Sequence, residues 1–146
     1  MLRQITVFLE NKPGRMEEVT ACLAENSINI HALSLADTAD FGILRMIMSD
    51  PDKAVRVLKE NNFMVKTTEV IAAAIGHSPG SLHKILKELK SHDISIEYMY
   101  AFTSHNREHN AIVVLRLVNQ DAVFNKLQNS SFPILGENLL DELNKS

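Results

Sequence analysis

The stretch ENKPGRM at residues 10–16 decides the fold, because it returns in outline 66 positions later as GHSPGSL at residues 76–82. Both copies keep the Pro-Gly pair, and the apolar residues around it keep the same spacing. With this offset Met16, Val19, Leu23, Ile28, Ile30 and Leu33 fall on Leu82, Ile85, Leu89, Ile94, Ile96 and Met99. A repeat of the apolar skeleton with freely changed polar positions predicts two copies of one core.

Farther along the chain the offset becomes 69. There Ile43, Met48, Asp52, Leu58 and Phe63 match Ile112, Leu117, Asp121, Leu127 and Phe132. The second copy therefore has three extra residues, which we place in a turn around residues 104–110. The repeat divides the chain into residues 1–70 and 71–146, two domains of equal kind.

Each copy has the periodicity of a small α+β unit. In the first copy we expect strands at 5–9, 28–35, 43–48 and 63–70, and helices at 16–25 and from Asp50-Pro51-Asp52 through Leu58. The order βαββαβ predicts a ferredoxin-like unit, an antiparallel sheet with helices on one face. Residues 63–75 contain no Gly, Pro or Asn, so we expect one copy to run into the next without a flexible linker. Residues 138–146 could finish a strand or begin a short helix.

Charge and composition exclude several classes of partner. The net charge is −3, and neither half of the chain is basic, so we expect no nucleic-acid binding. The longest apolar stretch, residues 70–75, is far below the roughly 18 residues of a membrane span, so we expect no membrane association. The single cysteine, Cys22, cannot form an intrachain disulfide, and we therefore expect a cytoplasmic protein in which Cys22 is a small apolar helix residue.

The Pro-Gly loop before the first helix of each copy is the best candidate for a binding site. A glycine there lets the backbone approach a ligand, and the unpaired amides of a helix start favour an anion such as a carboxylate. The oxygens of Asn11 and Asn29 could accept hydrogen bonds from the other end of a zwitterion, and we expect these two residues to lie close together. The alternative is that Pro-Gly only makes a tight turn.

The run Glu10-Asn11-Lys12-Pro13-Gly14, followed by Ser27-Ile28-Asn29-Ile30, resembles the signature of the ACT domain. It is similar in particular to the serine-sensing ACT domain of phosphoglycerate dehydrogenase. The resemblance extends over both copies and implies a tandem ACT protein without a catalytic domain or cofactor. It further implies an amino-acid effector, a homodimer, and a partner enzyme of amino-acid metabolism whose activity the protein regulates.

In that family the effector sits between two ACT units, with the strand-to-helix loop of one unit facing the start of the second strand of its neighbour. The resemblance therefore implies these ligand-binding residues: Leu9, Asn11, Lys12, Pro13, Gly14, Arg15, Met16, Asn29 and Ile30 in the first copy, and His77, Ser78, Pro79, Gly80 and Ser95 in the second. Leu9 stands where the serine-binding version has a histidine, so an apolar or other small effector is as plausible as serine.

Other readings have less support in the sequence. His105 and His109 have a spacing that suits a metal only in a helix, and they fall in the inserted turn, so we expect no metal site. Neither Cys22 nor His77 has a nucleophile or base at a sequence spacing that indicates a catalytic pair, so we expect that the protein is not an enzyme. The competing hypothesis is a ligand-independent structural or interaction module, in which the Pro-Gly turns only build the fold.

Overall fold

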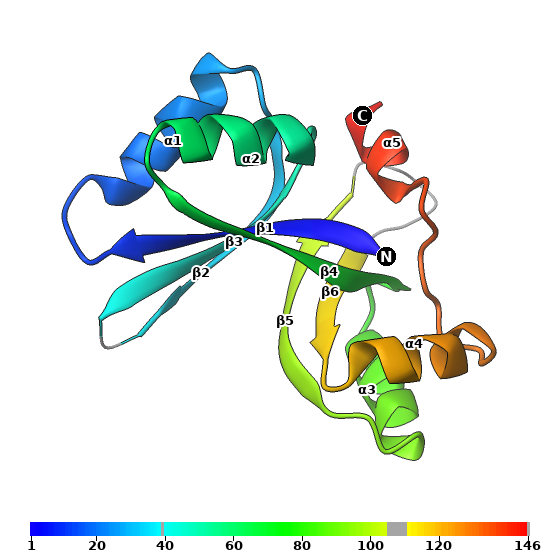
Figure 1. Cartoon of the computed structure of the whole chain (residues 1–146). Coiled ribbons are helices and arrows are strands. Elements are labelled where there is room, and N and C mark those ends of the chain that lie inside the picture. The colour runs from blue at the N-terminus through cyan, green and yellow to red at the C-terminus, as the bar shows by residue number, and fades with distance from the viewer. Residues whose placement is uncertain (39, 105–110, 146) are drawn as a thin grey trace. The chain divides into compact units, whose positions relative to one another are not determined.

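The computed structural model describes residues 1–38, 40–104 and 111–145, and it divides the chain into two compact units (Figure 1). The N-terminal unit is Arg3–Thr68, and the C-terminal unit is Glu69–Ser146 together with Met1–Leu2. The elements in chain order are β1 (Leu2–Glu10), α1 (Arg15–Glu25), β2 (Ile30–Asp37), β3 (Phe41–Met48), α2 (Pro51–Glu60), β4 (Met64–Ile75), α3 (Ser81–Ser91), β5 (Ile96–Thr103), β6 (Ala111–Leu117), α4 (Gln120–Gln128) and α5 (Leu139–Asn144). This α+β order confirms the expected pair of ferredoxin-like units.

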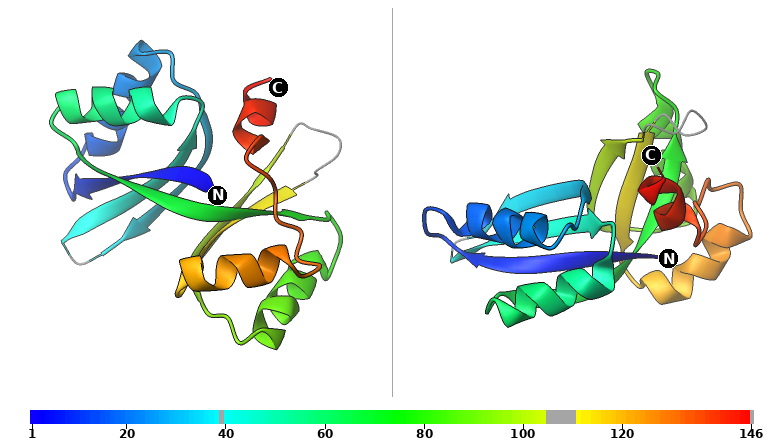
Figure 2. Two further views of the ribbon diagram at one scale, coloured as in Figure 1. Left: turned by 45° about the vertical axis from the view of Figure 1, so that its right-hand side comes forward. Right: turned by 90° about the horizontal axis from the view of Figure 1, so that it is seen from above.

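In the N-terminal unit the strands lie in the order β2-β3-β1-β4, with β3 antiparallel to both β1 and β2. Helices α1 and α2 cover one face of this sheet (Figure 2). Alternate residues of each strand point to that face, as a pleated strand requires, and meet the apolar stripes of the helices. The core consists mainly of Ile5, Val7, Leu9, Val19, Leu23, Leu44, Met46, Met48, Ala54, Val57, Leu58 and Phe63.

The C-terminal unit repeats this arrangement with strands in the order β5-β6-β4, and α3 and α4 pack on one sheet face. Its core contains Ile71, Ala73, Ile85, Leu89, Val113, Leu115, Leu117, Leu127 and Phe132. These residues stand at the predicted offsets of 66 and 69 from core residues of the N-terminal unit. The repeat seen in the sequence is therefore a repeat of buried positions.

The last strand of the second copy is shorter than the βαββαβ pattern predicts. Ile134 forms a single bridge with Ala73, flanked by hydrogen bonds from the Ala74 amide to the Pro133 carbonyl (3.0 Å) and from the Leu135 amide to the Ala72 carbonyl (2.8 Å). Gly136 follows soon after, and the chain then turns into α5 instead of extending the strand.

The tail of the chain forms a helix, which settles the choice left open by its sequence. Helix α5 buries Leu139 and Leu143 against Ala72 and Ile112, on the face of the C-terminal sheet that α3 and α4 leave uncovered (Figure 1). Among the residues that the structure describes, no helix is long and apolar enough to cross a membrane.

Strand β4 joins the two units without a loop, as the absence of Gly, Pro and Asn predicts. Its twelve residues are one continuous strand, and the division between the units falls inside it, after Thr68. Val65 packs on the N-terminal core, whereas Ile71 and Ala73 belong to the C-terminal core. One strand therefore supplies core residues to both units.

Candidate functional site

The loop between β1 and α1 has a geometry that requires glycine. Gly14 is the N-cap of α1 with φ 87° and ψ −7°, a left-handed conformation that L-residues with a side chain rarely adopt. A Cβ atom built on Gly14 would meet nothing within 4 Å, so backbone conformation and not crowding selects glycine. The amide of Lys12 donates to the Glu10 carbonyl (2.8 Å) and that of Glu18 to the Gly14 carbonyl (3.0 Å), which fixes the turn.

The start of α1 offers free hydrogen-bond donors. No side chain caps the helix, and within the described residues the amides of Met16 and Glu17 have no hydrogen-bond acceptor. The dipole of the helix adds partial positive charge at the same end. Together they make this end of α1 chemically suited to a carboxylate.

A cavity of about 440 Å³ lies beside this loop. Of the predicted site residues it is lined by Leu9, Asn11, Lys12, Pro13, Arg15 and Met16. The opposite wall, Leu35–Asp37 and Gly42, was not predicted from the sequence. This wall lies opposite the loop because Asp37 and Leu9 both pair with Gly42. The β-hairpin expected from the sequence could have predicted this wall.

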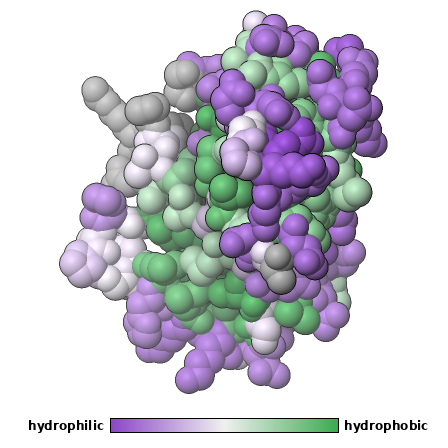
Figure 3. Space-filling view, turned by 90° about the vertical axis from the view of Figure 1, so that its left-hand side faces the viewer, coloured by the Kyte–Doolittle hydropathy of each residue, from purple (hydrophilic) through white to green (hydrophobic). Residues whose placement is uncertain are grey.

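This end of the N-terminal unit also exposes apolar side chains. Leu35 is 53% exposed and Leu33 48%, both on the edge strand β2, and Phe41 at the start of β3 is 37% exposed. Figure 3 looks onto this end of the unit and shows hydrophobic side chains open to the surface among hydrophilic ones. Of these three, Leu35 lines the cavity together with Leu9 and Met16, which gives the cavity an apolar side opposite its polar loop side.

The charged groups of the loop are partly neutralised by one another. Lys12 contacts Glu10 (Nζ–Oε2 2.9 Å), and its hydrogen bond and positive charge hold the pKa of the Glu10 carboxyl below its usual range. Arg15 forms an ion pair with Glu18, and its guanidinium lies 4.8 Å from the centre of the Phe63 ring. Arg15 Nε is buried with no hydrogen-bond partner in the described structure, as expected for a guanidinium held against an aromatic face.

Asn29 and Ile30 are not near this loop in their own unit, so the expectation that Asn11 and Asn29 lie close together is wrong. Ile30 pairs with Met48 at one end of β3, whereas Leu9 pairs with Gly42 at the other end. At about 3.3 Å per residue the two positions are roughly 20 Å apart along the strand. The strand register separates Asn29 from the loop. Because β1 and β2 both run antiparallel to β3, the start of β2 lies at the same end of the sheet as the start of β1, whereas the loop follows the end of β1. Asn29 instead exchanges hydrogen bonds with Ser49, both 2.9 Å.

The C-terminal loop repeats the backbone with other side chains. Gly80 is the N-cap of α3 with φ 89°, and a cavity of about 360 Å³ is lined by Ile75, Gly76, His77, Ser78, Pro79, Ser81 and Leu82. Of the predicted residues only Ser95 lies apart from it. Ser95 precedes β5 and its carbonyl accepts from the Val118 amide (3.0 Å), at the end of the sheet opposite the loop.

A further cavity of about 350 Å³ lies on the other side of the C-terminal loop, toward Pro133. Lys84 and Glu88 of α3 line it, and neither was singled out from the sequence, where they look like an ordinary solvated helix face. Comparison of the two copies would have given a signal, because Lys84 stands at the repeat position of the oppositely charged Glu18.

The remaining candidates have no site around them in the described structure. Cys22 is buried, accepts a hydrogen bond from Asn61 Nδ2 (3.4 Å), and burial raises the pKa of its thiol, so it is the packed helix residue that the sequence favours. His105 and His109 lie outside the described residues. Among the residues described, no three His, Cys, Asp or Glu side chains gather as a metal site would require.

Comparison with known proteins identifies the family. Its model, the ACT domain pair, matches residues 1–142. Protein BT0572 from Bacteroides thetaiotaomicron is 42% identical, with 99% of this chain and 96% of that chain covered and a TM-score of 0.84. The ligand-free regulatory subunit of aspartate kinase from Thermus thermophilus is 15% identical, with 88% and 91% covered and a TM-score of 0.59, and so shares the fold. No match was found among curated protein sequences. The chain belongs to the ACT domain pair family.

Proposed function

We propose that this protein is a non-catalytic regulator that binds an amino acid at the β1–α1 loop of its N-terminal unit. The observation that carries the proposal is the cavity of about 440 Å³ where the free amides of α1 and the side chains of Asn11 and Lys12 meet an apolar wall. The membership in the ACT domain pair family supports it, because the resemblance stated above implies an amino-acid effector at this loop.

The lining suggests how an amino acid would be oriented. Its carboxylate would take the amides of Met16 and Glu17, and the Asn11 side-chain oxygen or the exposed Asp37 carboxylate would accept from its ammonium group. Leu9, Leu35 and Met16 then face the side chain of the effector. We therefore expect an amino acid with a small or apolar side chain to bind more tightly than a charged one.

A contribution from Asn29 requires a second ACT unit. Because Asn29 lies at the opposite end of its own sheet, it can hold an effector only at the loop of another ACT unit. We propose that a homodimer brings Asn29 of one protomer to the loop of its partner. The effector would then stabilise one arrangement of the subunits, and a partner enzyme would sense that arrangement.

The regulatory role is supported by what similar folds do. The neighbours from Thermus thermophilus and Thermus flavus are regulatory subunits of aspartate kinase, with TM-scores of 0.59 and 0.55. By analogy we propose that the partner here is an enzyme of amino-acid metabolism.

The first test is a thermal-shift screen of the purified protein against the twenty amino acids at millimolar concentration. A ligand that binds only the folded state raises the melting temperature in a saturable way. We expect one or two amino acids to do so. We expect Asn11→Ala to weaken binding by about tenfold, the effect of losing one hydrogen bond to a charged group. His77→Ala, at the repeat position of Asn11, is the matched control and should leave this affinity unchanged.

Gly14→Val gives an independent test of the loop. Valine would force φ out of the left-handed region and move the amides of α1 away from the ligand. Gly80→Val carries the same backbone strain in the other unit, so it controls for the loss of stability. No shift with any amino acid would favour the ligand-independent interaction module instead. Wild-type affinity in both Asn11→Ala and Gly14→Val would overturn the assignment of the ligand to this loop.

A further inference from the structure

The cavity between α3 and Pro133 differs chemically from its counterpart in the N-terminal unit. There, a cavity of about 470 Å³ is lined by Arg15, which lies over the Phe63 ring and pairs with Glu18, so that each of these two charges is neutralised by the other. The repeat positions of Arg15 and Glu18 carry Ser81 and Lys84. Serine carries no charge that could pair with position 84, so the lysine leaves the C-terminal cavity with a positive charge.

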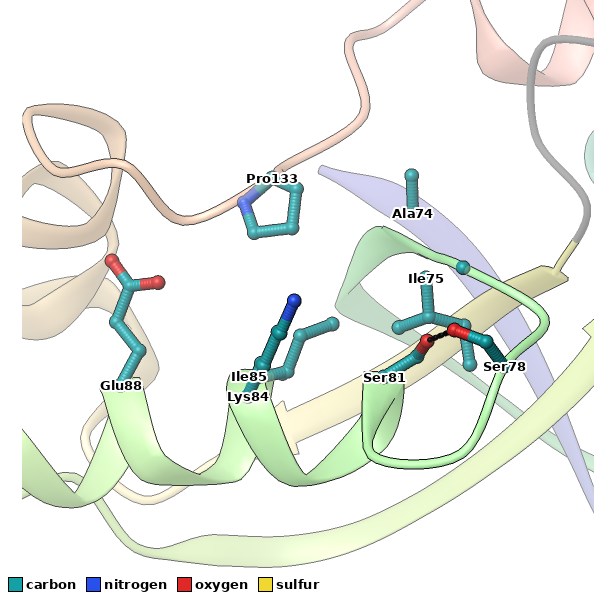
Figure 4. Close-up of a pocket in the computed structure, with 9 residues that line it drawn as sticks. Ala74, Ile75, Ser78, Ser81, Lys84, Ile85, Glu88 and Pro133 are labelled. Atoms are coloured by element: carbon teal, nitrogen blue, oxygen red, sulfur yellow. Dashed lines mark hydrogen bonds between the residues drawn. The ribbon is translucent and has the colours of Figure 1, made fainter.

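The cavity of about 350 Å³ holds two opposite charges that do not pair with each other (Figure 4). Lys84 points into it from α3, and no carboxylate in the described residues lies within ion-pair distance of its Nζ. Glu88, one turn farther along the helix, is held by the Ser131 hydroxyl, which donates to its Oε1 (3.1 Å). The two charges therefore stand apart along one wall of the cavity.

The rest of the lining supplies hydroxyls and an apolar surface. The hydroxyls of Ser78 and Ser81 are 3.0 Å apart and hydrogen-bonded to each other at the loop end (Figure 4). Ala74, Ile75, Ile85 and Pro133 provide the apolar surface. A Cβ at Gly76 would come within 3.0 Å of the Ser81 Oγ, so glycine at 76 leaves room for this pair.

We propose that this cavity is a second amino-acid site, distinct from the one at Asn11 and independent of it. The ligand's carboxylate would bind Lys84 and the serine hydroxyls, its ammonium group would bind Glu88, and a small apolar side chain would lie against Ile75, Ile85 and Pro133. A multiply charged anion such as phosphate fits less well, because Glu88 would repel it. The separated charges match a zwitterion, in which the two groups flank one carbon.

The test titrates L-valine into the full chain. Binding is monitored by ¹H–¹⁵N correlation spectra and by calorimetry. We expect saturable perturbation of the amides of residues 76–88. Two analogues that each lack one charge, 3-methylbutanoate and isobutylamine, should bind at least about tenfold more weakly than valine. Equal binding of 3-methylbutanoate would overturn the zwitterion assignment, and no perturbation of these amides by valine would overturn the site.

Variants then separate the two sites. Lys84→Ala and Glu88→Gln should each weaken valine binding at residues 76–88 by about tenfold, whereas Lys87→Ala, an exposed lysine of the same helix, should not. Asn11→Ala should leave binding at residues 76–88 unchanged, so failure of one site does not imply failure of the other. The double variant Ser81→Arg/Lys84→Glu, which installs the residue types of the N-terminal pair, should abolish the binding. Retention of full affinity in Lys84→Ala or in the double variant would overturn the proposal.

Discussion

The two units of this protein share a backbone and differ in their charges. Gly14 and Gly80 have φ of 87° and 89°, and the buried residues of the two cores correspond position by position. Beside these glycines, however, Arg15 and Glu18 form an ion pair in one unit, whereas Lys84, at the repeat position of Glu18, has no such ion pair in the described part of the other. The difference teaches that apolar positions fix the fold of a repeat, while exchange of a few polar side chains changes the charge of the cavity beside the same turn.

The largest loss of stability is expected in the two hydrophobic cores, where the comparison predicts that equivalent substitutions have equal effects. Leu23 and Leu89 are repeat partners on α1 and α3, each 1% exposed. Truncation to alanine removes the same buried surface and leaves a cavity, so Leu23→Ala and Leu89→Ala should each lower the free energy of unfolding by about 3 kcal/mol. Urea denaturation of each variant measures this. The exposed Lys90→Ala serves as control, and a loss of less than about 1 kcal/mol in either leucine variant would show that the two cores are not equivalent.

A smaller effect should distinguish the units at their second helices. Asp50 caps α2 by accepting a hydrogen bond from the Lys53 amide (3.0 Å), whereas its repeat partner Asn119 has a left-handed backbone, φ 53°, and no side-chain cap bond. Asp50→Ala should cost about 1 kcal/mol, and Asp50→Ser should restore most of it. Asn119→Gly should not lower stability, because glycine adopts this backbone more readily. Equal losses in Asp50→Ala and Asn119→Gly would contradict the assigned difference.

The smallest effect concerns a surface ion pair that exists in one unit only. Arg3 donates to Asp52 (2.6 Å), and this hydrogen bond together with the positive charge lowers the pKa of the Asp52 carboxyl. At the repeat positions stand Glu69 and Asp121, which cannot form such a pair. Asp52→Asn should lower the melting temperature slightly at neutral pH and low salt, and Asp121→Asn should not.

The pH dependence of that pair has a definite sign. A carboxyl whose pKa is lower in the folded state stabilises the fold above its unfolded pKa, about 3.9. That contribution disappears as the pH falls through the folded value. The difference between wild type and Asp52→Asn should therefore shrink on acidification below about pH 4, followed by thermal melts across that range. A difference that grows on acidification would rule out the pair as its cause.

Much of the fold could be predicted because it depends on apolar spacing. The offsets of 66 and 69 locate both cores, Asp50-Pro51 marks a helix start, and the lack of Gly, Pro and Asn in residues 63–75 predicts the uninterrupted β4. The shortened last strand at Ile134 was missed because the strand was extrapolated from the first copy, although Pro133 and Gly136 are signals that could have shown its early end.

The site was predicted less completely, because proximity depends on register and not on spacing. The loop residues from Leu9 to Met16 are neighbours in sequence, so the structure brings them together as expected. Asn29 follows the same loop in sequence but lies at the far end of the sheet, since the start of β2 pairs with the end of β3. Lys84 and Glu88 were missed because single charges on a helix face carry no signal until their repeat partners are compared.

The continuous strand β4 has a consequence for how this gene can tolerate insertions and deletions. Side chains along a strand alternate between faces, so removal of one residue near Thr68 would exchange the faces of every residue on one side of the cut. Val65 or Ile71 and Ala73 would then leave their cores. A flexible linker would accommodate such a deletion, but in a continuous strand the deletion would shift the register of all residues on one side of it. We therefore expect chains of this design to vary in length at their loops and not between their repeats.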